Sequence, residues 1–124
     1  MDVTQAGAAE GDGPWLVAFN VLNPTGDPVD LVDAWLPHAR FNAVAQKLDG
    51  LTLAGGESTR LAFTATYDEP PGTAAENAFV IIRLRWRGGA WRHLTRMTVT
   101  SGSRGEPSAT VETVSCHRVG FSTD

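Results

Sequence analysis

The chain has 124 residues, about the length of one domain, and its apolar fraction of 42% and charged fraction of 19% are ordinary for a globular protein. The formal net charge is -4. It is unevenly divided: residues 1–76 contain eleven acidic and three basic residues, whereas residues 77–124 contain three acidic and seven basic ones. No apolar run approaches the roughly 18 residues of a membrane span, and the N-terminus lacks the basic and apolar segments of a signal peptide. We therefore expect no membrane span and a cytoplasmic location.

The two ends of the chain differ in composition from its middle. Residues 1–13 are rich in Gly, Ala and acidic residues and carry few large apolar side chains, so they cannot bury enough surface to offset their ordering entropy. We expect a mobile tail over residues 1–13, a single domain over residues 14–121, and a short C-terminal end over residues 122–124.

Short segments of alternating apolar and polar residues, separated by turn signals, predict β-strands throughout this domain. Residues 38–48 are ambiguous, because they fit either a helical turn or a short strand. The spacing of the turns predicts an all-β fold, an antiparallel sandwich of seven or eight strands. The expected strands cover about 15–22, 29–36, 61–67, 77–87, 90–100 and 110–119. The candidate core residues are Trp15, Phe19, Trp35, Phe63, Ile82, Leu84, Trp86, Trp91 and Val111.

The clearest local pattern is a β-hairpin within residues 81–94, where two alternating runs flank Gly88 and Gly89. If these two glycines form the loop, Trp86 faces Trp91 across the ladder, where the aromatic pair would stabilise the hairpin. One face of the hairpin is then apolar and points into the core.

The other face of this hairpin is rich in arginine. The predicted register places Arg85 opposite Arg92, and like charges in that position need an acidic partner or solvent. Arginine rather than lysine favours bidentate contacts with carboxylate or phosphate groups. An alternative is that acidic strands elsewhere in the fold neutralise the charge. The candidate partner-binding residues are Phe79, Ile81, Arg83, Arg85, Arg87, Arg92 and Arg96.

A family resemblance lies upstream of the hairpin. Residues 51–63 read Leu-Thr-Leu-Ala-Gly-Gly-Glu-Ser-Thr-Arg-Leu-Ala-Phe. This run resembles the "Leu-x-Pro-Gly-Glu-Ser/Thr, then alternating apolar" segment of bacterial immunoglobulin-like and fibronectin-III-like modules. Residues 21–23, Val-Leu-Asn before a Pro/Gly turn, resemble the early strand of those modules. Gly55 replaces the usual Pro, and paired cysteines are absent. The resemblance implies an immunoglobulin-like sandwich used for adhesion, spacing or docking, and no reaction.

Residues suited to catalysis or metal binding do not form recognisable motifs. His38, His93 and His117 lack metal-ligand spacing, and the sequence contains no nucleophile elbow. The single cysteine, Cys116, excludes an intrachain disulfide and is interpreted as a small core residue. We expect no catalytic residue, no metal and no cofactor.

A paired-carboxylate site could use Asp68, Glu69 and Glu76, which flank a Pro-Pro-Gly loop, although solvation of the loop explains them as well.

The sequence thus favours a non-catalytic protein-interaction module or small accessory subunit, whose partner is another protein or a second copy of the chain. A binder of anionic polymer or small anions through the same arginines is an alternative. An enzyme whose site is not recognisable from the sequence is another. Nucleic acid is disfavoured by the negative net charge and by the lack of an aromatic pattern among the arginines.

Overall fold

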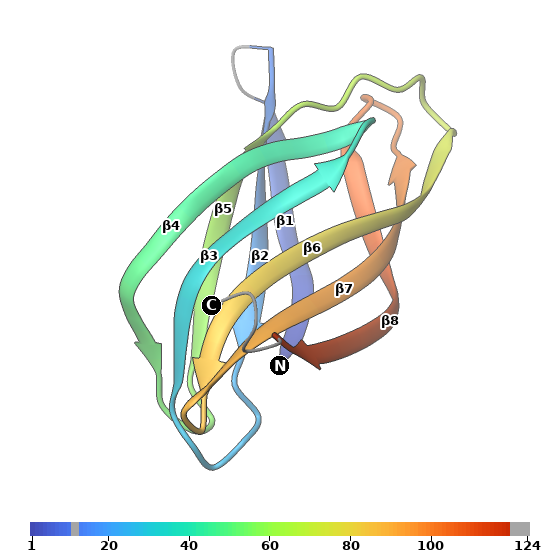
Figure 1. The fold of residues 1–124 in the computed structure, drawn as a ribbon. Helices are drawn as coiled ribbons and strands as arrows, with labels where there is room; N and C mark the ends of the chain where they lie inside the picture. Colours follow the sequence, from blue (N-terminus) through green and yellow to red (C-terminus); the bar gives the residue numbers. More distant parts are fainter. Residues whose placement is uncertain (11–12, 120–124) are drawn as a thin grey trace.

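The fold is seen in a computed structural model, which describes residues 1–10 and 13–119. The described residues form eight β-strands and no helix, so the all-β prediction is confirmed (Figure 1). The strands are β1 (Asp2–Glu10), β2 (Trp15–Leu22), β3 (Val29–His38), β4 (Phe41–Leu53), β5 (Ser58–Ala65), β6 (Ala74–Trp86), β7 (Gly89–Ser101) and β8 (Pro107–Arg118).

The strands form two antiparallel sheets that lie one behind the other in Figure 1. One sheet has the order β1-β2-β5 and the other the order β4-β3-β6-β7-β8. Alternate residues of both sheets are buried and form one core that includes Phe19 and Phe63, whose rings pack edge to face at 5.8 Å. No helix in the described part of the chain is long and apolar enough to cross a membrane.

The first strand differs from the expectation of a mobile tail over residues 1–13. Asp2–Glu10 form β1, which pairs with β2 and buries Val3 in the core. An edge strand of this kind is held mainly by backbone hydrogen bonds. Because these bonds do not depend on the side chains, the amino-acid composition does not predict them. Residues 11–12, the predicted domain limit at 121 and the predicted C-terminal end, residues 122–124, lie outside the described residues.

The ambiguous segment of residues 38–48 is extended. Most of it belongs to β4, an edge strand of the five-stranded sheet. Phe41 at its start is fully buried and packs edge to face against Tyr67, with ring centroids 5.7 Å apart. This aromatic contact places the start of β4 in the core.

The hairpin between β6 and β7 has a different loop from the predicted one. Its central residues are Arg87 and Gly88, with φ angles of 50° and 72°, as a type I′ turn requires. Gly89 is instead the first residue of β7 and pairs with Trp86. The prediction of a Gly88-Gly89 loop is therefore wrong by one residue.

This change moves each cross-strand partner by two residues. Arg92 faces Arg83 rather than Arg85, and Trp91 faces Leu84. Because side chains alternate with a period of two, the division into an apolar inner face and an arginine-bearing outer face is unchanged and confirmed. Trp86 still contacts Trp91 diagonally, with ring centroids 5.7 Å apart.

A β-bulge in β3 changes which side chains face the core. The register shifts between Leu31 and Asp33, so the inner positions move from Leu31 to Ala34. Trp35 consequently points to the outer face and is half-buried, although the sequence predicted it as core. Of the other predicted core residues, Trp15, Phe19, Phe63, Ile82 and Leu84 are buried, and Trp86, Trp91 and Val111 are partly buried.

Candidate functional site

The outer face of β6 and β7 carries six of the seven predicted partner-binding residues. Their neighbours in sequence, such as Val80 and Ile82, are fully buried, so the alternation directs these six side chains outward. Arg87 lies apart, in the turn. We call this surface the Arg face; its predicted members are Phe79, Ile81, Arg83, Arg85, Arg92 and Arg96.

An apolar strip crosses the Arg face. Trp35 of β3, Ile81 of β6 and Leu94 of β7 are consecutive partners across three strands, and Phe79 lies two residues from Ile81 on the same side. All four are half-buried. The sequence does not predict Trp35 on this face, because the bulge in β3 changes the side on which it lies. Leu94 could have been placed there from its alternation with His93. The Arg face therefore has an apolar centre beside its charges.

Two of the arginines are neutralised by aspartates from the acidic half of the chain. Arg83 donates from Nε to Asp33 Oδ1 at 2.8 Å and from a second nitrogen to Asp33 Oδ2, and these bonds raise the pKa of Arg83. Arg87 donates to Asp27 at 2.7 Å, and its guanidinium lies 4.4 Å from the ring centroid of Trp86. These ion pairs join the acidic and basic parts of the chain, so two of the seven basic residues in its second part are neutralised within the fold.

Arg85 and Arg92 form no ion pair with the described residues. Asp30 is the ladder partner of Arg85, but its carboxylate accepts a hydrogen bond from Thr52 at 2.6 Å. Together with Arg83, these two arginines line a hollow of about 340 Å³ whose wall includes Val32 and Trp91. We call it the Arg hollow. Arg83 is already paired with Asp33, so the guanidinium groups of Arg85 and Arg92, beside apolar walls, are the ones that suit a carboxylate carried on an apolar chain.

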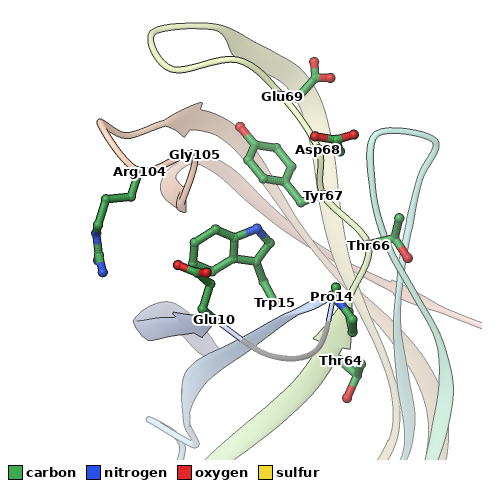
Figure 2. A pocket seen from close by; sticks show the side chains of 11 residues that line it. Glu10, Pro14, Trp15, Thr64, Thr66, Tyr67, Asp68, Glu69, Arg104 and Gly105 are labelled. Atoms are coloured by element: carbon green, nitrogen blue, oxygen red, sulfur yellow. The ribbon is translucent and has the colours of Figure 1, made fainter.

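A second hollow, which the sequence did not predict, lies at one end of the two sheets (Figure 2). It is bordered by the end of β1, the residues at the start of β2, the residues after β5 and the β7–β8 loop. Its volume is about 690 Å³, within the range of small-molecule sites. We call it the end pocket; it is lined by Glu10, Gly13, Pro14, Trp15, Thr64, Thr66, Tyr67, Asp68, Glu69, Arg104 and Gly105.

The structure separates the three carboxylates of the candidate paired site, because Glu76 lies in a different hollow from Asp68 and Glu69. Asp68 and Glu69 line the end pocket, as does Glu10 from β1. Glu76 instead lines a smaller surface hollow with Arg96. The sequence shows the acidic residues of the loop but not Glu10, because the composition of residues 1–13 predicts a tail rather than a strand.

The remaining titratable groups are dispersed. His93 is fully buried and donates from Nε2 to the carbonyl of Met1 at 2.8 Å; burial lowers its pKa to about 4. Cys116 is exposed rather than in the core. In residues 1–10 and 13–119, no three His, Cys, Asp or Glu side chains converge as metal ligands would.

Comparison of the chain with protein-family models, curated protein sequences and solved structures found no match. The chemistry of the Arg face is therefore the basis for assigning a role.

Proposed function

We propose that the protein is a non-catalytic interaction module that docks an acidic segment of a partner protein on its Arg face. The observation that carries the proposal is the Arg hollow. Arg85 and Arg92 converge there with no ion pair to the described residues, next to the half-buried apolar strip. An apolar centre with a charged rim is the usual anatomy of a protein interface.

The arrangement fits a partner that combines carboxylates with apolar side chains. Trp35, Phe79 and Ile81 provide aromatic and aliphatic anchors, and arginine and tryptophan are common among residues that dominate binding energy. The row from Arg83 to Arg92 runs beside the row from Ile81 to Leu94, so one extended segment can reach both. A uniformly charged polymer would use only the arginines.

The immunoglobulin-like arrangement belongs to the same proposal. Asn23 follows β2, is fully buried, and donates from Nδ2 to the carbonyls of Asp27 and Leu53 at 2.7 and 3.0 Å. The resemblance to the early strand of immunoglobulin-like modules rests on the residues that end in this asparagine. Docking would take place in the cytoplasm, where Cys116 stays a free thiol.

The test measures binding of three labelled peptides, one alternating Glu and Leu, one of polyglutamate, and one alternating Gln and Leu. Fluorescence anisotropy is recorded for the wild type and for Arg85→Glu/Arg92→Glu. The control Arg60→Glu/Arg104→Glu changes the net charge equally at exposed positions on other elements. Circular dichroism checks that each variant folds.

We expect the Glu/Leu peptide to bind most tightly, and its affinity to fall at least tenfold in the Arg85/Arg92 variant but not in the control. Equal binding of polyglutamate, with a steep loss in salt, would favour the anionic-polymer alternative. An unchanged affinity in the Arg85/Arg92 variant would show that the Arg face is not the docking surface.

A further inference from the structure

The last part of β8 is an edge that no other described strand covers. β8 is the outermost strand of the five-stranded sheet and pairs only with β7 (Figure 1). At its beginning, the side chain of Gln5 binds the Pro107 carbonyl and the Ala109 N–H. From Thr113 to Arg118, the described residues provide no backbone hydrogen-bond partner on the side away from β7. This stretch is therefore available for pairing with another strand.

The register of the β7–β8 ladder identifies which backbone groups point away from the sheet. The Val119 N–H donates to the Ala90 carbonyl at 2.8 Å, so these two residues form a hydrogen-bonded pair. Because such pairs alternate with non-hydrogen-bonded ones, Val114, Cys116 and Arg118 direct their N–H and C=O groups outward. These groups form the regular row of donors and acceptors that an added strand requires.

The inner face of this edge carries exposed apolar side chains. Val114 and Cys116 are the ladder partners of Thr95 and His93, which are fully buried. Val114 is nevertheless 48% exposed, and Cys116 is exposed as well. Beside Cys116 lies an apolar hollow of about 190 Å³, whose walls include both tryptophans of the β6–β7 hairpin. An apolar side chain brought to this edge by another strand would therefore meet apolar neighbours.

The opposite edge of the same sheet is protected against such pairing. β4 has two register irregularities against β3, and it carries Lys47 and Gly50, which has a φ of 84°. The side chain of Gln46 also donates to the Ala62 carbonyl of β5 at 3.0 Å. Bulges, lysines and covering side chains keep an edge from pairing, and residues 113–118 have an unbroken register with no lysine, glycine or proline. Pairing through one edge alone gives a closed dimer rather than a fibre.

We propose that two copies of the chain pair antiparallel along β8, with the twofold axis at Ser115. In this register Val114 of each copy exchanges backbone hydrogen bonds with Cys116 of the other, because both residues point outward. Their side chains then form one apolar cluster on the inner face. The same register sets Glu112 of each copy opposite Arg118 of the other, so unlike charges lie at both ends of the pairing. An axis at Val114 or Cys116 gives no such complementarity.

The pairing does not depend on the docking role of the Arg face. Residues 113–118 do not line the Arg hollow. A dimer can therefore form whether or not an acidic segment binds there, and the two proposals can fail separately.

The first experiment is sedimentation equilibrium of the full chain at increasing concentration, in reducing buffer. Ser115→Lys places two like charges directly opposite each other at the axis. Val114→Pro removes one outward N–H without removing a hydrogen bond to β7. The control Ser108→Lys adds the same charge at an exposed position of β8 outside the pairing. Circular dichroism checks that each variant folds.

The second experiment tests the register by oxidative cross-linking. In Ser115→Cys/Cys116→Ser, the Cα atoms of residue 115 in the two copies would lie about 4.5 Å apart, which a disulfide can join. In His117→Cys/Cys116→Ser, the Cα atoms of residue 117 would lie about 13 Å apart, which a disulfide cannot span.

We expect a reversible dimer whose Kd rises at least tenfold in Ser115→Lys and in Val114→Pro and is unchanged in Ser108→Lys. A disulfide-linked dimer should form in Ser115→Cys/Cys116→Ser and not in His117→Cys/Cys116→Ser. A wild type that stays monomeric at every concentration, or a dimer that is equally stable in Ser115→Lys, would overturn the proposal. Equal cross-linking of the two cysteine variants would overturn the axis at Ser115.

Discussion

Two buried side-chain atoms on the inner face of β7 have no hydrogen-bond partner in the described part of the chain, His93 Nδ1 and Thr95 Oγ1. Both residues are fully buried, two positions apart on one strand. A buried polar atom without a partner loses its bonds to water and gains nothing in return. These two residues therefore lower the stability of the fold in ways that single substitutions can measure.

The first prediction concerns Thr95→Val, which replaces the unpaired hydroxyl with a methyl group of similar shape. We expect the free energy of unfolding to rise by about 1 kcal/mol, because the desolvation penalty is removed and the packing is kept. Urea denaturation measures the change. Thr100→Val, at an exposed position on the same strand, is the control and should lie within about 0.5 kcal/mol of the wild type. A clear loss of stability in Thr95→Val would mean that the hydroxyl has a partner after all.

The second prediction concerns pH and His93. Burial lowers its pKa from 6.5 to about 4, so between these values the proton binds to the unfolded chain and not to the folded one. The titration of His93 leaves the free energy of unfolding unchanged above pH 6.5 and lowers it as the pH falls toward 4, because the unfolded chain takes up the proton first. The full loss amounts to about 3 kcal/mol.

Urea titrations at pH 7 and pH 4.5 measure this loss. The substitution His93→Gln removes the titrating group, so the difference in unfolding free energy between the two pH values should shrink. His117→Gln, at an exposed position, should leave the difference unchanged. An equal pH dependence in wild type and His93→Gln would contradict the assignment.

At the level of strands, the sequence was informative about which side of a strand faces the core and less informative about register. Alternation in β6 and β7 predicted both faces, because a shift of partners by two residues keeps every side chain on its side. The loop was misplaced because Arg87 has a positive φ, which favours Gly or Asn, while Gly89 has none. Glycine is favoured at position 89 by close neighbours rather than by its φ angle. A Cβ there would lie 3.1 Å from Trp91 Nε1 and 3.3 Å from the Arg118 guanidinium.

Irregularities within strands account for the other differences. The bulge beside Val32 reverses the alternation in β3 and brings Trp35 to the Arg face, and nothing in the local sequence marks it. The arginines of the Arg face could be predicted because they belong to one hairpin. The end pocket could not be predicted, because its lining comes from three separate parts of the chain. One of these includes Glu10, which belongs to β1, a strand that the composition of residues 1–13 does not predict.

The third prediction tests the turn. The substitution Gly88→Ala places a side chain on a residue with φ of 72°, where L-residues are strained, so we expect a loss of about 1–2 kcal/mol in unfolding free energy. Gly26→Ala is the control, since that glycine lies in open space without a positive φ. Thermal or urea denaturation checks both variants. Equal stability of the two would mean that Gly88 is not a central residue of the turn.

At the level of the whole molecule, the side chain of Gln5 links the two sheets where β1 lies beside β8. Gln5 of β1 donates from Nε2 to the Pro107 carbonyl at 3.0 Å, and its Oε1 accepts from the backbone N–H of Ala109 in β8. β1 and β8 are edge strands of different sheets, and the Gln5 amide satisfies backbone groups that β8 would otherwise expose. The Gln5 amide thus forms two hydrogen bonds to the backbone of β8, as a neighbouring strand would.

This link separates the observed fold from the tail that composition predicted. In a mobile tail, Gln5→Ala would have no effect on stability. In the structure it removes two hydrogen bonds, and we expect the free energy of unfolding to fall by about 2 kcal/mol. The amide proton of Ala109 should also exchange faster with solvent, because the substitution removes its hydrogen-bond acceptor, Gln5 Oε1. Thr4→Ala, an exposed neighbour on the same strand, is the control. If both variants are as stable as the wild type, and Ala109 exchanges equally fast in all three proteins, β1 does not hold the sheets together and the sandwich is closed by its core alone.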